Sequence, residues 1–137
     1  MDTFGVFKVS ASALEAQRKR MNVVASNMAN VQTTRTEEGG PYKRKDVIFS
    51  TAPVEAGRDD GLEGVRVTEV VEDASPPIQV YDPGHPEADE EGYVRMPNIS
   101  VIEEMVNMMM AVRAYEANIT TFNISKGMVR KTLELGR

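Results

Sequence analysis

Apolar residues recur at intervals of seven over the last third of the chain, along two parallel lines. The first line consists of Met105, Val112 and Ile119, and the second of Val101, Met108, Tyr115, Phe122 and Val129. Two lines offset by three or four residues correspond to the a and d positions of a heptad helix. Ser100 and Glu103 have the spacing of a capping box, and Pro97 disfavours an earlier start. The pattern therefore predicts a long helix over residues 100–130.

The beginning of the chain shows the same period in a weaker form. One line runs through Phe7, Leu14, Met21 and Met28, and the other through Ser10, Gln17, Val24 and Val31. Because Ser10 and Gln17 are polar, the apolar stripe is poorer at the start of this helix, which we expect over residues 4–30. Beyond it, amide and threonine side chains compete for backbone hydrogen bonds, and a glycine–glycine–proline run at 39–41 forms a firm break.

A long helix with one apolar stripe is marginal alone in water and needs a partner for that stripe. Since the middle of the chain returns towards its start, we predict a mainly α fold in which the terminal helices form an antiparallel coiled coil. Met28 then lies near Met105 or Met108, and Leu14 lies near Phe122. A compact bundle that uses the same stripes as its core agrees equally well with the periodicity. The residues expected in helix packing, within or between chains, are Phe7, Leu14, Met21, Val24, Met28, Met105, Met108, Val112, Tyr115, Ile119 and Phe122.

The middle of the chain has the pattern of a small, loop-rich β insert. Strands are expected at residues 46–50, 65–71, 78–81 and 93–96. A glycine-rich, acidic loop over residues 53–64 separates the first two strands, and the last two are expected to pair as a hairpin across residues 82–92. The predicted domains are a coiled-coil domain, residues 1–31 plus 98–137, and an inserted β lobe, residues 32–97.

Composition narrows the possible classes of function. The chain of 137 residues has 6% aromatic residues and no tryptophan, which disfavours a large compact core and favours an elongated shape. The absence of cysteine excludes disulfides, thiolate metal sites and cysteine nucleophiles. The net charge of −5 disfavours nucleic acid as a partner. We also expect neither a membrane span nor a cleaved signal peptide, because no segment has the required apolar length.

Three features indicate contacts with other helices or chains. The first third of the chain is basic and the middle is acidic, so copies could attract one another, although solvated faces explain most of these charges. Met109 and Met110 lie partly round the helix from its stripe and are candidates for contact with a second chain. Amides such as Asn27, Asn30 and Asn118 are candidates for fixing the register between helices, although some of them will be ordinary exposed positions.

The sequence contains no recognisable catalytic constellation. Its one histidine, His85, has acidic neighbours that could bind zinc or calcium, but a turn residue is the simpler interpretation. Pro83 and Pro86 hold this segment extended, and its spacing matches no calcium loop. The common hydrolase, nucleotide-binding and zinc-protease motifs are absent. Glu103 and Glu104 suit the positive end of a helix dipole better than acid–base catalysis. We therefore expect no enzyme activity, no cofactor and no metal.

Several stretches resemble the bacterial flagellar axial proteins, the rod and hook family. SASALEAQRKRMNVVASNMANVQTTRT resembles their N-terminal helix and turn, and EEMVNMMMAVRAYEANITTFN resembles their C-terminal helix. GGPYKRKDVIF and VYDPGHPEADEEGYVRMPN resemble the proximal rod members of the family. The signature positions are Asn27, Asn30, Thr33, Asp82, Pro83, Gly84, His85, Pro86, Tyr115, Glu116 and Asn118. The resemblance covers nearly the whole chain and departs over residues 53–64 and after residue 126.

The resemblance implies a structural subunit of the proximal rod in the flagellar basal body, which assembles helically and transmits torque across the periplasm. It implies export by the flagellar type III apparatus without a cleaved signal peptide. The implied partners are copies of the chain, rod proteins of the FliE, FlgB, FlgF and FlgG types, and MS-ring and export-gate components. The alternative is a soluble helical adaptor or chaperone that binds a partner helix with its methionines.

Overall fold

Both ends of the chain form the helices that their heptad patterns predict. The computed structural model describes residues 3–54 and 61–136, in which α1 spans Thr3–Ala29 and α2 spans Val101–Leu135. Ser100 caps α2: its backbone is extended, and its side-chain oxygen accepts a hydrogen bond from the Glu103 amide at 3.4 Å. α2 continues past residue 130 because no glycine or proline follows before residue 136.

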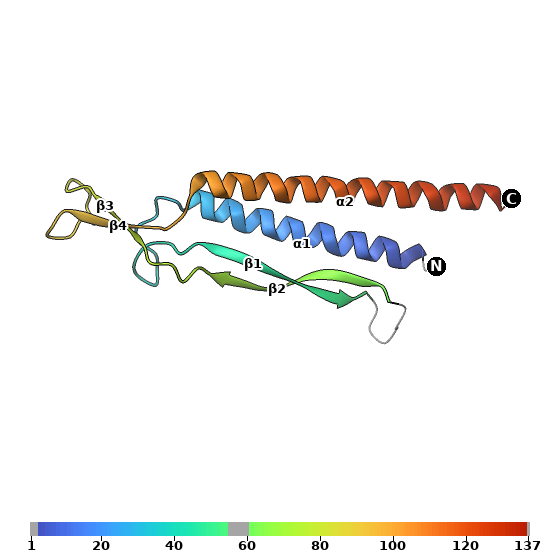
Figure 1. Cartoon of the computed structure of the whole chain (residues 1–137), viewed down its shortest axis with the longest axis horizontal. Helices are drawn as coiled ribbons and strands as arrows, with labels where there is room; N and C mark the ends of the chain where they lie inside the picture. The colour runs from blue at the N-terminus through green and yellow to red at the C-terminus, as the bar shows by residue number, and fades with distance from the viewer. Residues whose placement is uncertain (1–2, 55–60, 137) are drawn as a thin grey trace.

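The two helices lie side by side and antiparallel, so the start of α1 and the end of α2 lie at the same end of an elongated molecule (Figure 1). α1 is the middle layer: α2 packs along one side of it, and a hairpin of β1 (Lys45–Pro53) and β2 (Glu63–Glu72) packs along the other. Ala16 and Val24 of α1 are buried. The predicted arrangement of two terminal helices with strands inserted between them is confirmed.

The middle of the chain consists of two antiparallel hairpins. In the first, β1 pairs with β2 along its whole length, from Lys45 opposite Glu72. In the second, β3 (Ile78–Tyr81) pairs with β4 (Tyr93–Met96), which confirms the predicted hairpin. The centre of the loop predicted over residues 53–64 lies outside the described residues, and its first and last residues belong to β1 and β2.

The stripe of α2 that is turned inward differs in part from the predicted one. The buried and half-buried positions of α2 include Glu104, Met108, Ala111, Tyr115, Asn118, Phe122 and Val129. By contrast, Met105, Val112 and Ile119 are 51%, 36% and 39% exposed. These three residues, which were predicted to take part in helix packing within or between chains, are therefore at least partly exposed in the single chain. Small and polar residues one position earlier take their place, and Ala111, which is fully buried, allows α1 and α2 to approach closely.

The register between the helices also differs from the predicted one. Phe7 packs against Phe122 with ring centroids 5.0 Å apart, and Asn27 is hydrogen-bonded to Glu104 near the other end of the pair. Seven residues of helix span about 10 Å. Because the helices are antiparallel, Leu14, which was expected near Phe122, therefore lies about one heptad closer to the start of α2. Two heptad stripes match equally well after a slip of seven residues, so apolar spacing alone does not select the register.

No helix within residues 3–54 and 61–136 combines the length and the apolarity that are needed to cross a bilayer. α1 has basic residues at positions 18–20, and α2 has Glu103 and Glu104 in its first turn and Arg113 near its middle. These charges interrupt the apolar runs of both helices, so the apolar residues form lateral stripes.

Candidate functional site

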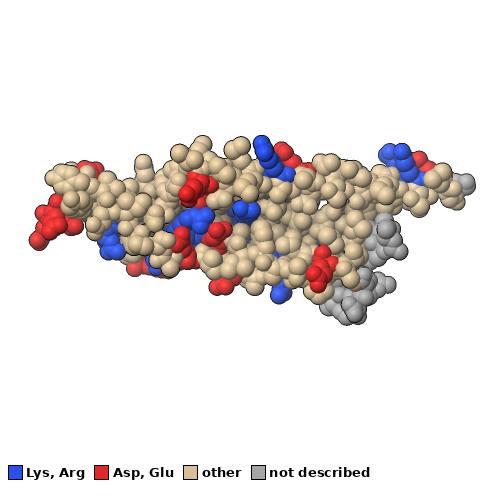
Figure 2. Space-filling model, viewed as in Figure 1, with Lys and Arg blue, Asp and Glu red and all other residues tan. Residues whose placement is uncertain are grey.

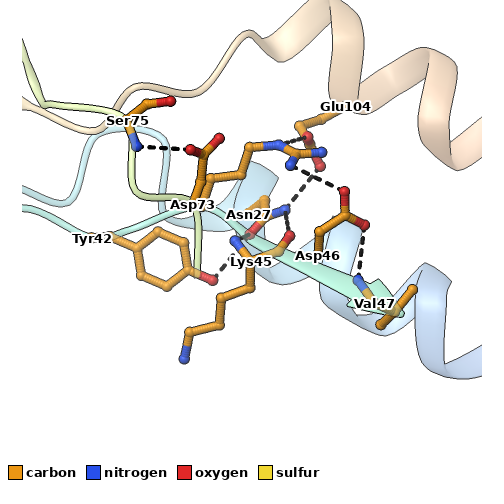
Figure 3. A network of polar contacts seen from close by, with 9 residues as sticks. Asn27, Tyr42, Lys45, Asp46, Val47, Asp73, Ser75 and Glu104 are labelled. Carbon is orange, nitrogen blue, oxygen red and sulfur yellow. Dashed lines mark hydrogen bonds and ion pairs between the residues drawn. The ribbon is translucent and has the colours of Figure 1, made fainter. Parts of the chain in front are cut away.

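A buried polar cluster joins the two helices to the first strand (Figure 3). Asn27 lies in the last turn of α1, Glu104 lies in the first turn of α2, and Arg44 and Lys45 lie where β1 begins. Asn27 is 0% exposed and Glu104 is 1% exposed. The antiparallel packing brings the end of α1 beside the start of α2, so these two residues meet although they are 77 positions apart in the sequence.

Asn27 uses the full hydrogen-bonding capacity of its side chain. Its Nδ2 atom donates to the Lys45 carbonyl oxygen at 2.7 Å and to Glu104 Oε2 at 3.0 Å. Its Oδ1 atom accepts from the Lys45 amide at 2.9 Å and from the Tyr42 hydroxyl at 3.2 Å. An amide side chain offers two donors and two acceptor positions, and all of them are engaged here. A buried and fully satisfied amide holds its neighbours in one arrangement.

Glu104 accepts a second hydrogen bond, from Arg44 Nε at 2.7 Å, and Arg44 Nη1 lies 3.3 Å from Asp46 Oδ2. Burial by itself lowers the pKa of Arg44, but the hydrogen bonds and charges of Glu104 and Asp46 outweigh it, so the pKa is raised. Burial, followed by the negative charges of Glu104 and Glu72, raises the pKa of Tyr42. At neutral pH the cluster therefore holds a charged guanidinium and a neutral phenol.

Sequence reasoning found one part of this cluster and missed the other. It marked Asn27 as a candidate for fixing the register, but it assigned Glu104 to the helix dipole. Ala111 and Asn118 follow Glu104 at intervals of seven, and this line of small and polar positions is the signal that could have placed Glu104 towards α1. Arg44 had no comparable signal, because a strand start has no period that indicates which side chain turns inward.

The exposed surface of α2, its outer face, carries many large apolar residues, and these are concentrated in its first part, residues 101–112. Its exposed large apolar residues are Val101, Ile102, Met105, Val106, Met109, Met110, Val112, Ile119, Ile124, Met128, Leu133 and Leu135. In Figure 2, the upper edge of the molecule, along which α2 runs, shows only scattered charged side chains. Monomeric proteins rarely expose contiguous apolar patches of more than a few hundred Å² unless the patch binds something. This outer face is therefore the candidate binding surface of the chain.

Two other groups of predicted signature residues stabilise local structure. After α1, Asn30 Nδ2 donates to the Ser26 carbonyl at 2.8 Å, and Thr33 Oγ1 donates to Asn30 Oδ1 at 3.0 Å. Within α2, Asn118 Nδ2 donates to the Ala114 carbonyl at 2.8 Å. These short-range bonds shape the turn after α1 and orient one amide on α2. They do not join the residues to the buried cluster.

The signature residues from Asp82 to Pro86 form the turn that follows β3. Asp82 Oδ1 accepts a hydrogen bond from the Gly84 amide at 3.2 Å, and His85 Nδ1 accepts one from the Glu87 amide at 3.0 Å. The side chain of His85 thus accepts a hydrogen bond from the backbone of this turn. Among the residues that the structure describes, no three histidine or carboxylate side chains lie close enough together to hold a metal ion.

Comparisons with known proteins agree on one family. The family described as flagella basal body rod protein matches residues 7–35, and the one described as flagellar basal body rod FlgEFG protein C-terminal matches residues 90–135. The flagellar basal-body rod protein FlgC of Salmonella typhimurium is 46% identical over 137 residues, and that of Escherichia coli O157:H7 is 44% identical over 137 residues. The FlgC protein of Bacillus subtilis is 43% identical over 150 aligned residues. Each alignment covers 100% of both chains.

Proposed function

The chain belongs to the FlgC family of flagellar basal-body rod proteins, and from this premise we propose that its two helices are the elements through which it assembles in the proximal rod. As a member of this family, it is a structural subunit of the basal-body rod and associates with other rod components. The observation that carries the assembly proposal is the set of large apolar side chains on the outer face of α2, which the other described residues leave exposed.

We propose that this outer face packs against neighbouring subunits. Met105, Val112 and Ile119 then serve as contacts between chains, whereas Met108, Tyr115 and Phe122 pack within one chain. Burying one such side chain completely contributes about 1.5–3 kcal/mol. Association costs roughly 4–15 kcal/mol in lost freedom of motion, so several side chains must be buried together. The face is long enough to supply that number, and in the rod the helices would form a coiled-coil layer.

The buried polar cluster supports a mechanical role in this scheme. Asn27, Arg44 and Glu104 connect α1, the start of β1 and α2 through hydrogen bonds of 2.7–3.0 Å. A force applied to either helix is then shared with the strands. We propose that residues 1–31 plus 98–137 form the axial part of the subunit and that residues 32–97 face its neighbours. Transmission of torque along a helical rod across the periplasm requires such internal stiffness.

The contact between the two helices contains few fully buried apolar residues, which is consistent with export of the subunit before assembly. The side of α1 that faces α2 includes the polar residues Ser10 and Gln17, and the side of α2 that faces α1 includes Glu104 and Asn118. A seam of this composition is weaker than an apolar one, so the isolated subunit would fold only marginally. This favours passage through the type III apparatus without a cleaved signal peptide. Rod proteins of the FliE, FlgB, FlgF and FlgG types, the MS ring and the export gate are the proposed neighbours, and we propose no catalytic role.

The test of the rod assignment is cryo-electron tomography of basal bodies in cells that lack this chain, together with a motility assay. We expect the membrane ring to be present and the rod, hook and filament to be missing. Expression of the chain from a plasmid should restore all three. Complete flagella in the deleted cells would refute the assignment and would favour a soluble adaptor or chaperone.

Replacing Tyr115 with aspartate tests the helix packing separately. Tyr115 is half-buried on the inward stripe of α2, and a carboxylate there is costly unless it is paired. We expect Tyr115→Asp to abolish rod assembly and swimming, whereas Tyr115→Phe, which keeps the ring, should assemble. Normal rods in cells that carry Tyr115→Asp would show that this stripe is not needed for assembly.

A further inference from the structure

The β3–β4 hairpin is an arm without a partner among the described helices and strands. Among the described helices and strands, β3 and β4 contact only each other, although Val94 of β4 is buried, and the hairpin projects from one end of the molecule (Figure 1). All of β3 is exposed, including Val80 at 44% and Tyr81 at 65%, and the ring of Tyr81 packs edge-on against Tyr93 at 5.3 Å. An isolated two-stranded hairpin is marginally stable in water. The exposed apolar side chains of β3 therefore favour a covering surface.

The opposite end of the molecule also carries an uncovered element. Because Phe7 lies opposite Phe122, the start of α1 lies beside the part of α2 that shortly follows Phe122. The last residues of α2 therefore extend beyond the start of α1 (Figure 1). On this projecting end, Met128, Leu133 and Leu135 are 65%, 70% and 87% exposed. The two ends of the long axis thus each present apolar side chains that no other described element covers.

The two ends carry opposite charge. Residues 78–96 contain five carboxylates and one arginine, a formal charge of −4. Residues 126–136 contain three basic residues and one glutamate, a formal charge of +2. Within these segments, Arg130 pairs with Glu134 at 3.8 Å, so Lys126 and Lys131 supply the excess positive charge. On the arm, Glu87 lies 3.7 Å from Arg35, and the other carboxylates remain in excess.

We propose that these two ends bind each other in successive copies of the chain, with the β3–β4 arm of one copy covering the projecting end of α2 in the next. The contact rests on the proposed function as a self-assembling subunit and specifies which surfaces meet. Val80 and Tyr81 bury apolar area against Leu133 and Leu135, while the acidic turn faces the lysines. A contact between two different surfaces can repeat from copy to copy, and it gives an open helical array when its rotation does not close into a ring.

Cysteine cross-linking between full-length chains tests this contact, because the chain has no cysteine of its own. One preparation carries Tyr81→Cys and a second, with a larger tag, carries Leu133→Cys. The matched control replaces the second with Ile102→Cys, which is 74% exposed at the other end of the same helix, compared with 70% for Leu133. With a short bis-maleimide we expect about tenfold more mixed dimer for Leu133→Cys, which corresponds to a preference of about 1.4 kcal/mol. Equal yields would overturn the proposal.

Charge reversal tests the electrostatic part independently. Changing Glu90 and Glu91 to lysine should lower the yield of the Tyr81–Leu133 cross-link about tenfold at low salt. Changing Lys126 and Lys131 to glutamate in the partner should restore it. These four side chains are exposed, so folding should be preserved, and circular dichroism checks this. The proposed contact would be contradicted if charge reversal left the cross-linking yield unchanged. It would also be contradicted if the compensating lysine-to-glutamate changes did not restore the yield.

The failure of this contact and the failure of the proposed function give different results. If deleted cells lack rods but purified chains show no preference for the Tyr81–Leu133 cross-link, the end-to-end contact is wrong and the rod assignment stands. If deleted cells build complete flagella, the rod assignment itself is wrong.

Discussion

Replacing Glu104 with alanine should release the strand from the helix pair. The carboxylate is 1% exposed and accepts hydrogen bonds from Arg44 at 2.7 Å and from Asn27 at 3.0 Å. Its removal leaves the guanidinium without its buried partner and one N–H of Asn27 unpaired. Breaking a buried ion pair from one side costs about 3–5 kcal/mol. The side chain of Arg44 is 20% exposed and keeps Asp46 as a partner, so we expect the lower end of that range, about 3 kcal/mol.

Hydrogen exchange at the Lys45 amide measures this loss directly, because that N–H donates to Asn27 Oδ1 at 2.9 Å. When exchange is limited by the opening equilibrium, a loss of about 3 kcal/mol speeds it by about a hundredfold. Glu103→Ala, at the exposed neighbouring position, should change the rate by less than about twofold. Changing both Arg44 and Glu104 to methionine should recover part of the loss, because neither charge is then left unpaired. A rate in Glu104→Ala within about threefold of the unmodified chain would refute the reasoning.

Three further substitutions, two of them paired with a control substitution, test other parts of the structure. Tyr42→Phe removes the hydrogen bond to Asn27 and should cost about 1 kcal/mol at neutral pH. Because the pKa of Tyr42 is raised above 10.0, the folded chain holds this proton more tightly than the unfolded chain, so stability falls as the pH rises through 10.0 and beyond. Tyr42→Phe should lack this part of the alkaline loss in thermal melts at increasing pH. Phe122→Ala removes the ring that packs on Phe7 and should cost about 2 kcal/mol, measured as faster exchange in the first half of α1. Ile124→Ala, at an exposed position, should cost less than about 0.5 kcal/mol. Gly64→Ala places a Cβ atom 2.6 Å from Ser12 Oγ, which accepts from the Val65 amide, and should cost about 1–3 kcal/mol. Gly127→Ala, in a helix with open space around it, should instead raise the melting temperature, and similar melts for both alanines would contradict the close approach of α1 and β2.

The elements that depend on local pattern were predicted well. Heptad spacing at both ends gave the helices, and Ser100 gave the start of α2 within one residue. The pairing of residues 78–81 with residues 93–96 followed from two short apolar runs with a turn between them. The candidate site was predicted less completely: Asn27 was recognised, but Glu104 and Arg44 were not. Their roles depend on contacts between segments that are far apart in the sequence.

By itself, the sequence determined which segments are helices and strands, because helical period, alternation and capping act over a few residues. Only the tertiary structure decided which side of α2 turns inward, because apolar residues lie on more than one side of this helix. Met105 and Met108 are equally hydrophobic, so hydrophobicity does not tell which of them faces α1. Met108 faces α1 because Ala111, on the same side of α2, allows the two helices to approach closely. The structure likewise decided the register, because stripes that repeat every seven residues match after a slip of seven. The single buried contact between Asn27 and Glu104, which does not repeat, removes that ambiguity.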